Sequence, residues 1–205
     1  GRGAGIYIAN SYSKLSMSGN SSINNNTATS DGGGVLVANA SVFNMTGGSI
    51  TNNKAANGAA VMLNYGGGDN HPTLHMSGGT IENNTATADD GGAINTDANA
   101  KLYFSGSAIV YDNPSADATQ QKNVVLSQDS NGIITTEGTG LKTNAHIGVY
   151  VTDQAVVKGE ESSTVYAEHG KLNTPFGMWL TNEDGTSSDG NLSKFTNDRD
   201  SSLFG

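Results

Sequence analysis

Asp90 and Asp97 are the two residues whose type and spacing best suit catalysis. They flank a short segment at residues 93–96. Glycoside hydrolysis usually needs two carboxyl groups about 5–10 Å apart, one on each side of the bond that breaks. Asp90, however, immediately precedes a glycine run, as turn residues do, and turns seldom give the burial that shifts a catalytic pKa. The sequence keeps a carbohydrate-active enzyme as an alternative and favours a non-catalytic protein.

Two histidines, His71 and His75, are the other candidates for chemistry, because they stand four residues apart. Zinc needs one or two further ligands, and the neighbouring sequence does not complete such a set. Calcium could use Asp89 and Asp90, or residues 68–70, but neither segment matches a known calcium-binding loop. We therefore predict neither a metal nor another cofactor.

An internal repeat determines which elements must position these residues. Residues 45–53 recur as residues 76–84, and a longer copy occupies residues 17–25. A second short apolar segment precedes each copy and begins at positions that are 29, 26, 33 and 30 residues apart: Ile6, Val35, Val61, Ile94 and Val124. No helical period accompanies these segments, and glycine or asparagine turns separate them. About three strands per repeat predict a parallel β-helix, an all-β solenoid.

Strand alternation predicts which side chains point inward. The first strands would stack Ile6, Val35 and their equivalents, and the second strands would stack residues such as Phe43 and Met45. The third strands would contribute Ile23, Ile50, Ile81 and Ile109. The glycine pairs before these isoleucines would supply positive φ angles at tight corners. We expect helical coils over residues 1–142, and last irregular coils with a β-rich C-terminal cap over residues 143–205.

Asparagine pairs follow the third strand of three coils. Asn25, Asn52 and Asn83 begin these pairs, and we predict that they form a ladder of stacked amides along the helix axis. A polar ligand site made of asparagine side chains is the alternative. Recurrence at equivalent corners favours the structural role, because one binding site does not need it.

One outward row of the predicted first strands is unusually apolar: Tyr7, Leu36, Met62, Asn95 and Val125. Such a row marks either an interaction surface or a surface that another part of the protein covers. Beside it, the outward second-strand positions Ser16, Asn44, His75 and Tyr103 could give a sugar hydrogen-bond partners and a stacking ring. Tyr65 in the long loop at residues 64–72 is a further candidate for binding.

Composition excludes several classes of function. The formal charge is −9, with only ten basic residues, so nucleic-acid binding is not expected. No apolar run is long enough for a membrane-spanning helix, so this segment is not expected to enter a membrane. The chain contains no cysteine and opens Gly1-Arg2-Gly3, as the middle of a repeat would. We expect a fragment of a longer parent chain.

The repeat unit at residues 32–37 and 43–53 resembles the repeats of large adhesin-like cell-surface proteins of gut bacteria and methanogens. This resemblance covers residues 3–113 well and residues 123–142 weakly. It implies a right-handed parallel β-helix, secretion, and a place at the cell surface within a long polypeptide. It brings no catalytic residues. The expected function is a non-catalytic adhesin-like scaffold that presents a face or loops to host glycans or surface proteins.

Overall fold

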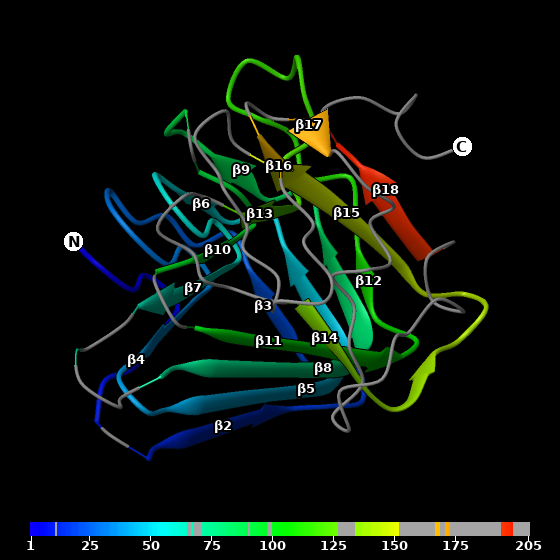
Figure 1. Cartoon of the computed structure of the whole chain (residues 1–205). Coiled ribbons are helices and arrows are strands. Elements are labelled where there is room, and N and C mark those ends of the chain that lie inside the picture. The colour runs from blue at the N-terminus through cyan, green and yellow to red at the C-terminus, as the bar shows by residue number, and fades with distance from the viewer. Residues whose placement is uncertain are drawn as a thin grey trace.

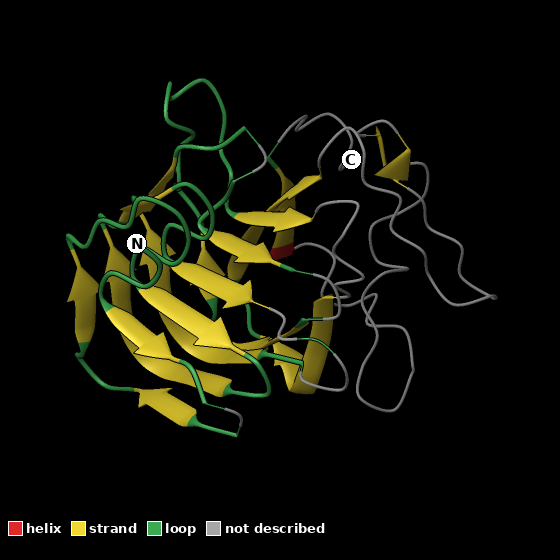
Figure 2. Ribbon diagram, turned by 90° about the vertical axis from the view of Figure 1, so that its left-hand side faces the viewer, coloured by secondary structure: helices red, strands yellow, loops and turns green. Residues whose placement is uncertain are grey.

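The computed structural model is all-β and confirms the predicted solenoid. The structure describes residues 1–10, 12–64, 67, 71–89, 91–97, 100–126, 134–151, 167–168, 171–172 and 194–198. Parallel strands stack in about four turns of a β-helix, as Figure 1 shows. In the side view of Figure 2, strands of successive coils lie beside one another and point the same way.

The first face of the helix is built from one short strand per coil. In spatial order these are β1 (Ile6–Ile8), β4 (Val35–Ala38), β7 (Val61–Asn64), β10 (Ile94–Thr96) and β13 (Val124–Leu126). Each pairs in parallel with the next, and the register aligns Ile6, Val35, Val61, Ile94 and Val124. The predicted stacking of the first strands is therefore confirmed.

The second and third faces are separate strands in some coils and one bent strand in others. The first coil has β2 (Lys14–Met17) and β3 (Ser22–Asn24), and a later coil has β11 (Lys101–Gly106) and β12 (Ile109–Val110). Between them, β5 (Val42–Thr51) and β8 (Thr73–Glu82) each run through both faces, with register shifts at the bend. The expected short pieces are thus joined at this corner in the middle coils.

The core lies inside the coils and consists of aligned apolar rows. Phe43, Leu74 and Leu102 pair in register on the second face, and all three are fully buried. On the third face Ile23, Ile50 and Ile81 align with Val110, which is buried, whereas Ile109 pairs with Thr80 and is partly exposed. The prediction of Ile109 as the inward residue was wrong by one position. In the observed register Val110 pairs with the inward Ile81, and Ile109, its neighbour along the strand, points to the opposite side.

The last coils depart from the pattern. β14 (Ile134–Leu141) extends the second face, and β15 (His146–Val151) pairs with both β12 and β13, so it serves the third and first faces at once. β18 (Phe195–Asn197) then pairs in parallel with β15. Two pairs of two-residue strands complete the described elements: β6 (Lys54–Ala55) with β9 (Thr85–Ala86), and β16 (Ala167–Glu168) with β17 (Lys171–Leu172). The boundary at residue 143 stays a prediction.

Glycine at the bend of the long strands is required by its backbone angle and by space. Gly48 and Gly79 have φ of +88° and +90°, which confirms the predicted positive φ at these corners. A Cβ on Gly79 would lie 2.7 Å from the carbonyl oxygen of Gly48 and 2.7 Å from Cε of Met45. Each coil therefore approaches the one before it too closely for a side chain here.

Replacing Gly79 by alanine should destabilise the protein by more than the cost of the backbone angle alone. Gly138 provides the matched control, since its φ is +60° but a Cβ there would meet nothing within 4 Å. We expect Gly138→Ala to cost about 1 kcal/mol and Gly79→Ala to cost at least about twice that, by urea unfolding. Equal losses would show that close packing of the coils at this corner contributes nothing.

Candidate functional site

A ladder of asparagine amides runs along the corner after the third strands, one residue later than predicted. Asn25, Asn52 and Asn83 do not form it. They adopt the left-handed conformation, with φ of 58°, 56° and 57°. The second asparagine of each pair points inward instead, and the ladder consists of Asn26, Asn53, Asn84, Asn113 and Asn123. The first asparagine of each pair thus turns the chain, and the second places its amide in the ladder.

Each rung of the ladder donates two hydrogen bonds to the next. The backbone N–H and Nδ2 of Asn53 both donate to Oδ1 of Asn84, each at 3.0 Å. Asn84 donates in the same way to Oδ1 of Asn113, at 3.0 and 2.9 Å. Nδ2 of Asn84 also donates to two backbone carbonyl oxygens, those of Ile50 and Glu82. Asn84 is fully buried, so the ladder satisfies polar groups that water cannot reach.

Asp198, directly after β18, accepts the last hydrogen bonds of the ladder. The backbone N–H of Asn123 donates to one carboxylate oxygen at 2.8 Å, and Nδ2 of Asn123 lies 2.9 Å from both oxygens. Burial raises the pKa of Asp198 to about 6, although the hydrogen bonds from Asn123 act in the opposite direction. Gly148 leaves the room for this contact, because a Cβ there would lie 2.4 Å from the carboxylate.

The apolar row of the first strands is aligned as predicted but is not exposed. Leu36 is 1% exposed and Met62 is 4% exposed, while Tyr7 at the first coil is 52% exposed. The backbone of Gly32 turns back onto Leu36, where a Cβ would lie 2.7 Å from the leucine Cβ, and Gly58 contacts Met62 in the same way. Leu36 and Met62 are therefore covered: of the two alternatives for this row, the covered surface holds for them and the open binding face does not.

On the outer side of the second strands, His75 and Tyr103 come together as a stacked pair. Their ring centroids are 4.6 Å apart and the planes differ by 8°. Glu137 on β14 reaches across the strand that carries Tyr103, and its carboxylate lies 2.9 Å from Nδ1 of His75. The side chain of His75 is 34% exposed and that of Glu137 is 18% exposed. The three side chains brace one another on a surface that solvent reaches.

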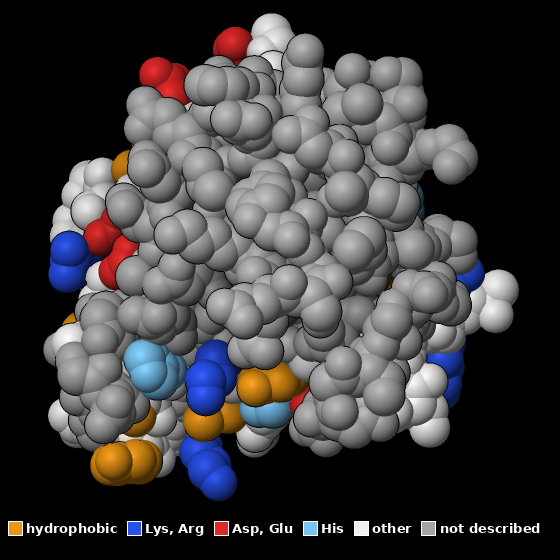
Figure 3. Space-filling view, viewed as in Figure 1, with side chains coloured by type: hydrophobic (Ala, Val, Ile, Leu, Met, Phe, Trp, Pro, Cys, Tyr) orange, Lys and Arg blue, Asp and Glu red, His pale blue; other side chains and the backbone are white. Residues whose placement is uncertain are grey.

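We define the second-strand face as the outward residues of β2, β5, β8, β11 and β14. Its members are Lys14, Ser16, Val42, Asn44, Thr73, His75, Lys101, Tyr103, Thr135 and Glu137. Figure 3, viewed as in Figure 1, shows lysine, histidine and hydrophobic side chains gathered at the lower part of the molecule, where these strands lie. The mixture of cationic, aromatic and neutral polar side chains distinguishes it from the apolar core rows, and Thr73 is its buried member.

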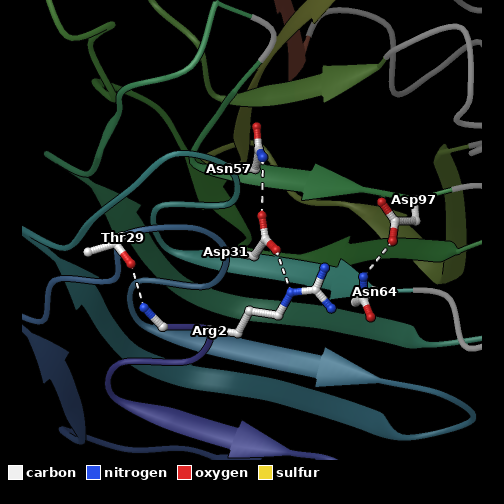
Figure 4. Close-up of polar contacts among 7 residues, drawn as sticks. Arg2, Thr29, Asp31, Asn57, Asn64 and Asp97 are labelled. Carbon is white, nitrogen blue, oxygen red and sulfur yellow. Dashed lines mark hydrogen bonds and ion pairs between the residues drawn. The ribbon is translucent and has the colours of Figure 1, made fainter.

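The predicted acidic candidates are only partly described. Asp90 and Tyr65 lie outside the described residues. Asp97 follows β10, and one of its carboxylate oxygens accepts a hydrogen bond of 2.6 Å from Nδ2 of Asn64 (Figure 4). In the same view Asp31 lies between Arg2, which forms an ion pair with it at 3.0 Å, and Asn57, which donates to it at 3.1 Å. These contacts hold neighbouring coils together.

Metal and membrane signals are absent from the part of the chain that the structure describes. Its residues include no group of three or more histidines, cysteines or acids placed to hold a metal ion. Among the same residues, no helix is both long and apolar enough to cross a membrane.

Sequence reasoning missed Glu137 and Asp198. Glu137 lies in a segment where the repeat has faded, and its contact with His75 spans 62 residues. One feature of the sequence could have pointed to Asp198: it directly follows a short strand-like segment, Phe195–Asn197, near the chain end.

Comparison with known proteins identifies no relative. No protein-family model matches the chain, and neither a curated protein nor a solved structure matches it. Function must therefore be argued from the residues themselves.

Replacing Asn84 by alanine should be far more damaging than replacing its neighbour. Asn84→Ala leaves the N–H and Nδ2 of Asn53 without their acceptor in a buried corner, so we expect a loss of about 3 kcal/mol in urea unfolding. Asn83→Gly is the matched control, because glycine accepts the positive φ of this position and should change stability by less than about 1 kcal/mol. A larger loss of stability in Asn83→Gly than in Asn84→Ala would show that Asn83 belongs to the ladder.

Replacing Asp198 by asparagine should stabilise the protein at neutral pH and not at low pH. Because the native pKa of about 6 lies above the ordinary 3.8, the native state holds the proton more tightly than the unfolded state. The ionised carboxylate therefore costs stability as pH rises from about 4 to about 6, by at most about 3 kcal/mol. The advantage of Asp198→Asn in unfolding free energy should appear over that window.

Asp117 is the control for this experiment. Hydrogen bonds from Ser115 and Thr119 lower the pKa of Asp117 to about 2, so its contribution to stability is lost only below about pH 4. Asp117→Asn should therefore leave the pH dependence of the unfolding free energy between pH 4 and 6 unchanged. An Asp198→Asn advantage that is constant with pH would contradict the assigned burial.

Proposed function

We propose that this chain is a non-catalytic, extracellular segment of a microbial cell-surface protein, and that it binds a glycan along the second-strand face. The observation that carries the proposal is the braced pair of His75 and Tyr103 with Glu137. A ring, a hydrogen-bonding imidazole and a carboxylate there meet on one partly exposed patch of a rigid sheet.

Rigidity supports a binding role for this patch. His75 and Tyr103 stand on paired strands whose inward neighbours, Leu74 and Leu102, are fully buried. The rings are already ordered by their mutual stacking, so a ligand loses little of its binding free energy to fixing them. Sites on regular strands also hold their geometry better than sites on loops.

The chemistry of the patch suits a sugar. An aromatic ring offers an apolar surface to the C–H groups of a sugar, while the side chains around it exchange hydrogen bonds with hydroxyl groups. Asn44 pairs in register with His75, and Ser16 pairs with Asn44, so polar side chains continue the same row toward the N-terminal coil. A row of this kind fits an extended oligosaccharide better than a compact ligand.

The resemblance of the repeats to adhesin-like surface proteins supports the extracellular setting. The stacked coils also suit a stiff spacer within a longer parent chain, since each coil contacts mainly its neighbours. A fragment of a carbohydrate-active enzyme is the competing function. Asp97 is its one described candidate, and that carboxylate accepts a hydrogen bond from Asn64.

Replacing Tyr103 by alanine should weaken glycan binding about tenfold, because it removes the ring surface and the brace on His75. Tyr12→Ala is the matched control, since Tyr12 is 80% exposed and lies outside the second-strand face. Binding is measured on an array of mucin-type and plant oligosaccharides, and hydrolysis of the bound sugars is followed in parallel. Turnover that is lost in Asp97→Asn would instead establish an enzyme, and equal effects of the two tyrosine variants would move the site elsewhere.

A further inference from the structure

We propose, resting on the glycan-binding function above, that the second-strand face selects acidic polysaccharides, whose carboxylate or sulfate groups pair with Lys14 and Lys101. The inference starts from charge. The chain carries 19 acidic and ten basic residues, yet the second-strand face holds two lysines and a single acidic residue, Glu137. This face is therefore locally cationic on a protein that is strongly anionic.

Both lysines are exposed and available to a ligand. Lys14 begins β2 and Lys101 begins β11, and each is an exposed residue of its strand. In the part of the chain that the structure describes, the ion pairs are those of Arg2 with Asp31 and of His75 with Glu137, and neither lysine takes part in them. Glu137 contacts His75 and forms an ion pair with neither lysine.

Lys101 is placed to act together with Tyr103. The two residues are separated by one position in β11, so they lie on the same side of the sheet with Cα atoms about 7 Å apart. A sugar ring that packs on the part of the Tyr103 ring that His75 does not cover would then bring a carboxylate or sulfate substituent within reach of the lysine side chain. Neutral sugars gain only the ring contact, which gives the face a basis for discrimination.

The position of Lys14 indicates a polymer. Lys14, Val42, Thr73 and Lys101 pair in register along one row, so the two lysines are separated by three steps between neighbouring strands, about 14 Å. When both lysine side chains stand away from the sheet, a chain of acidic sugars lying along the helix axis can engage both ammonium groups without bending the two side chains toward each other. His75 and Asn44, in the adjoining row, contact the intervening sugars.

The net charge of −9 does not prevent this binding. At physiological ionic strength the field of an exposed charge is screened over about 8 Å, so the acidic residues on other faces contribute little at the lysines. The same screening predicts that the interaction weakens as salt is added.

The test compares polysaccharides that differ only in charge, with the full 205-residue chain immobilised. Oligomers of polygalacturonate are measured against their carboxyl-reduced counterparts, and dextran sulfate is measured against dextran of equal length. We expect at least tenfold tighter binding of one or both acidic polymers at 0.15 M salt (about physiological ionic strength), with affinity falling as salt is raised. The two arms distinguish carboxylate from sulfate recognition.

Three lysine variants locate the charge effect. Lys14→Ala and Lys101→Ala should each weaken binding of the acidic polymer about three- to fivefold and leave binding of the neutral one unchanged. Lys54→Ala is the matched control, because Lys54 is an exposed strand lysine on β6, outside the second-strand face. Its affinity should equal that of the unmodified chain.

The outcomes separate this inference from the proposed function. Equal affinity for acidic and neutral polymers, or equal effects of Lys101→Ala and Lys54→Ala, overturns charge selection and leaves glycan binding standing. Binding to mucin that survives removal of its glycans overturns the inference in favour of a protein partner. Failure to bind any polysaccharide overturns both proposals.

Discussion

The stacking of identical polar groups from one coil onto the next is the constraint on which this structure depends. A parallel β-helix repeats its corners every turn, so any buried polar group at a corner meets a copy of itself above and below. Asparagine satisfies this requirement because its side chain accepts with Oδ1 and donates with Nδ2. In this protein the amides of Asn53, Asn84 and Asn113 each accept from the rung before, donate to the rung after, and donate to two backbone carbonyls. The apolar rows on the three faces can be fully buried because the corner between them is satisfied in this way.

The inner face of the solenoid could be predicted almost completely from the sequence. Alternation and the repeated spacing are sufficient to align Ile6 with Val35, Val61 and Ile94, because inward positions tolerate little besides apolar side chains. Errors of one residue arose where two neighbours were chemically equivalent. The sequence does not show which of Asn83 and Asn84 belongs to the ladder, because both are asparagines and both tolerate a corner. Only the backbone angle decides which amide points inward. Ile109 and Val110 present the same ambiguity.

The outer surface was harder to predict, because exposure depends on segments that the strand pattern does not describe. The sequence left open whether the apolar row with Leu36 and Met62 is exposed or covered, and glycines of the corner before each strand turn back onto these two residues. The cover is backbone, which carries no hydrophobic signal of its own. The candidate site shows the opposite case. His75 and Tyr103 could be paired from register alone, whereas Glu137 joins them across 62 residues from a coil whose sequence no longer repeats.

The ladder also has a direction, and the direction has an electrostatic consequence. Every rung donates toward the C-terminal end, so the side-chain amides form a column of parallel dipoles whose positive end faces Asp198. The column resembles an α-helix in this respect, with the carboxylate placed where an acidic residue stabilises a helix N-terminus. At the N-terminal end of the column the same carboxylate would face the side-chain oxygen of the first rung, Asn26, and would be repelled. The amide column thus distinguishes the two ends of a fold whose repeating coils otherwise look alike.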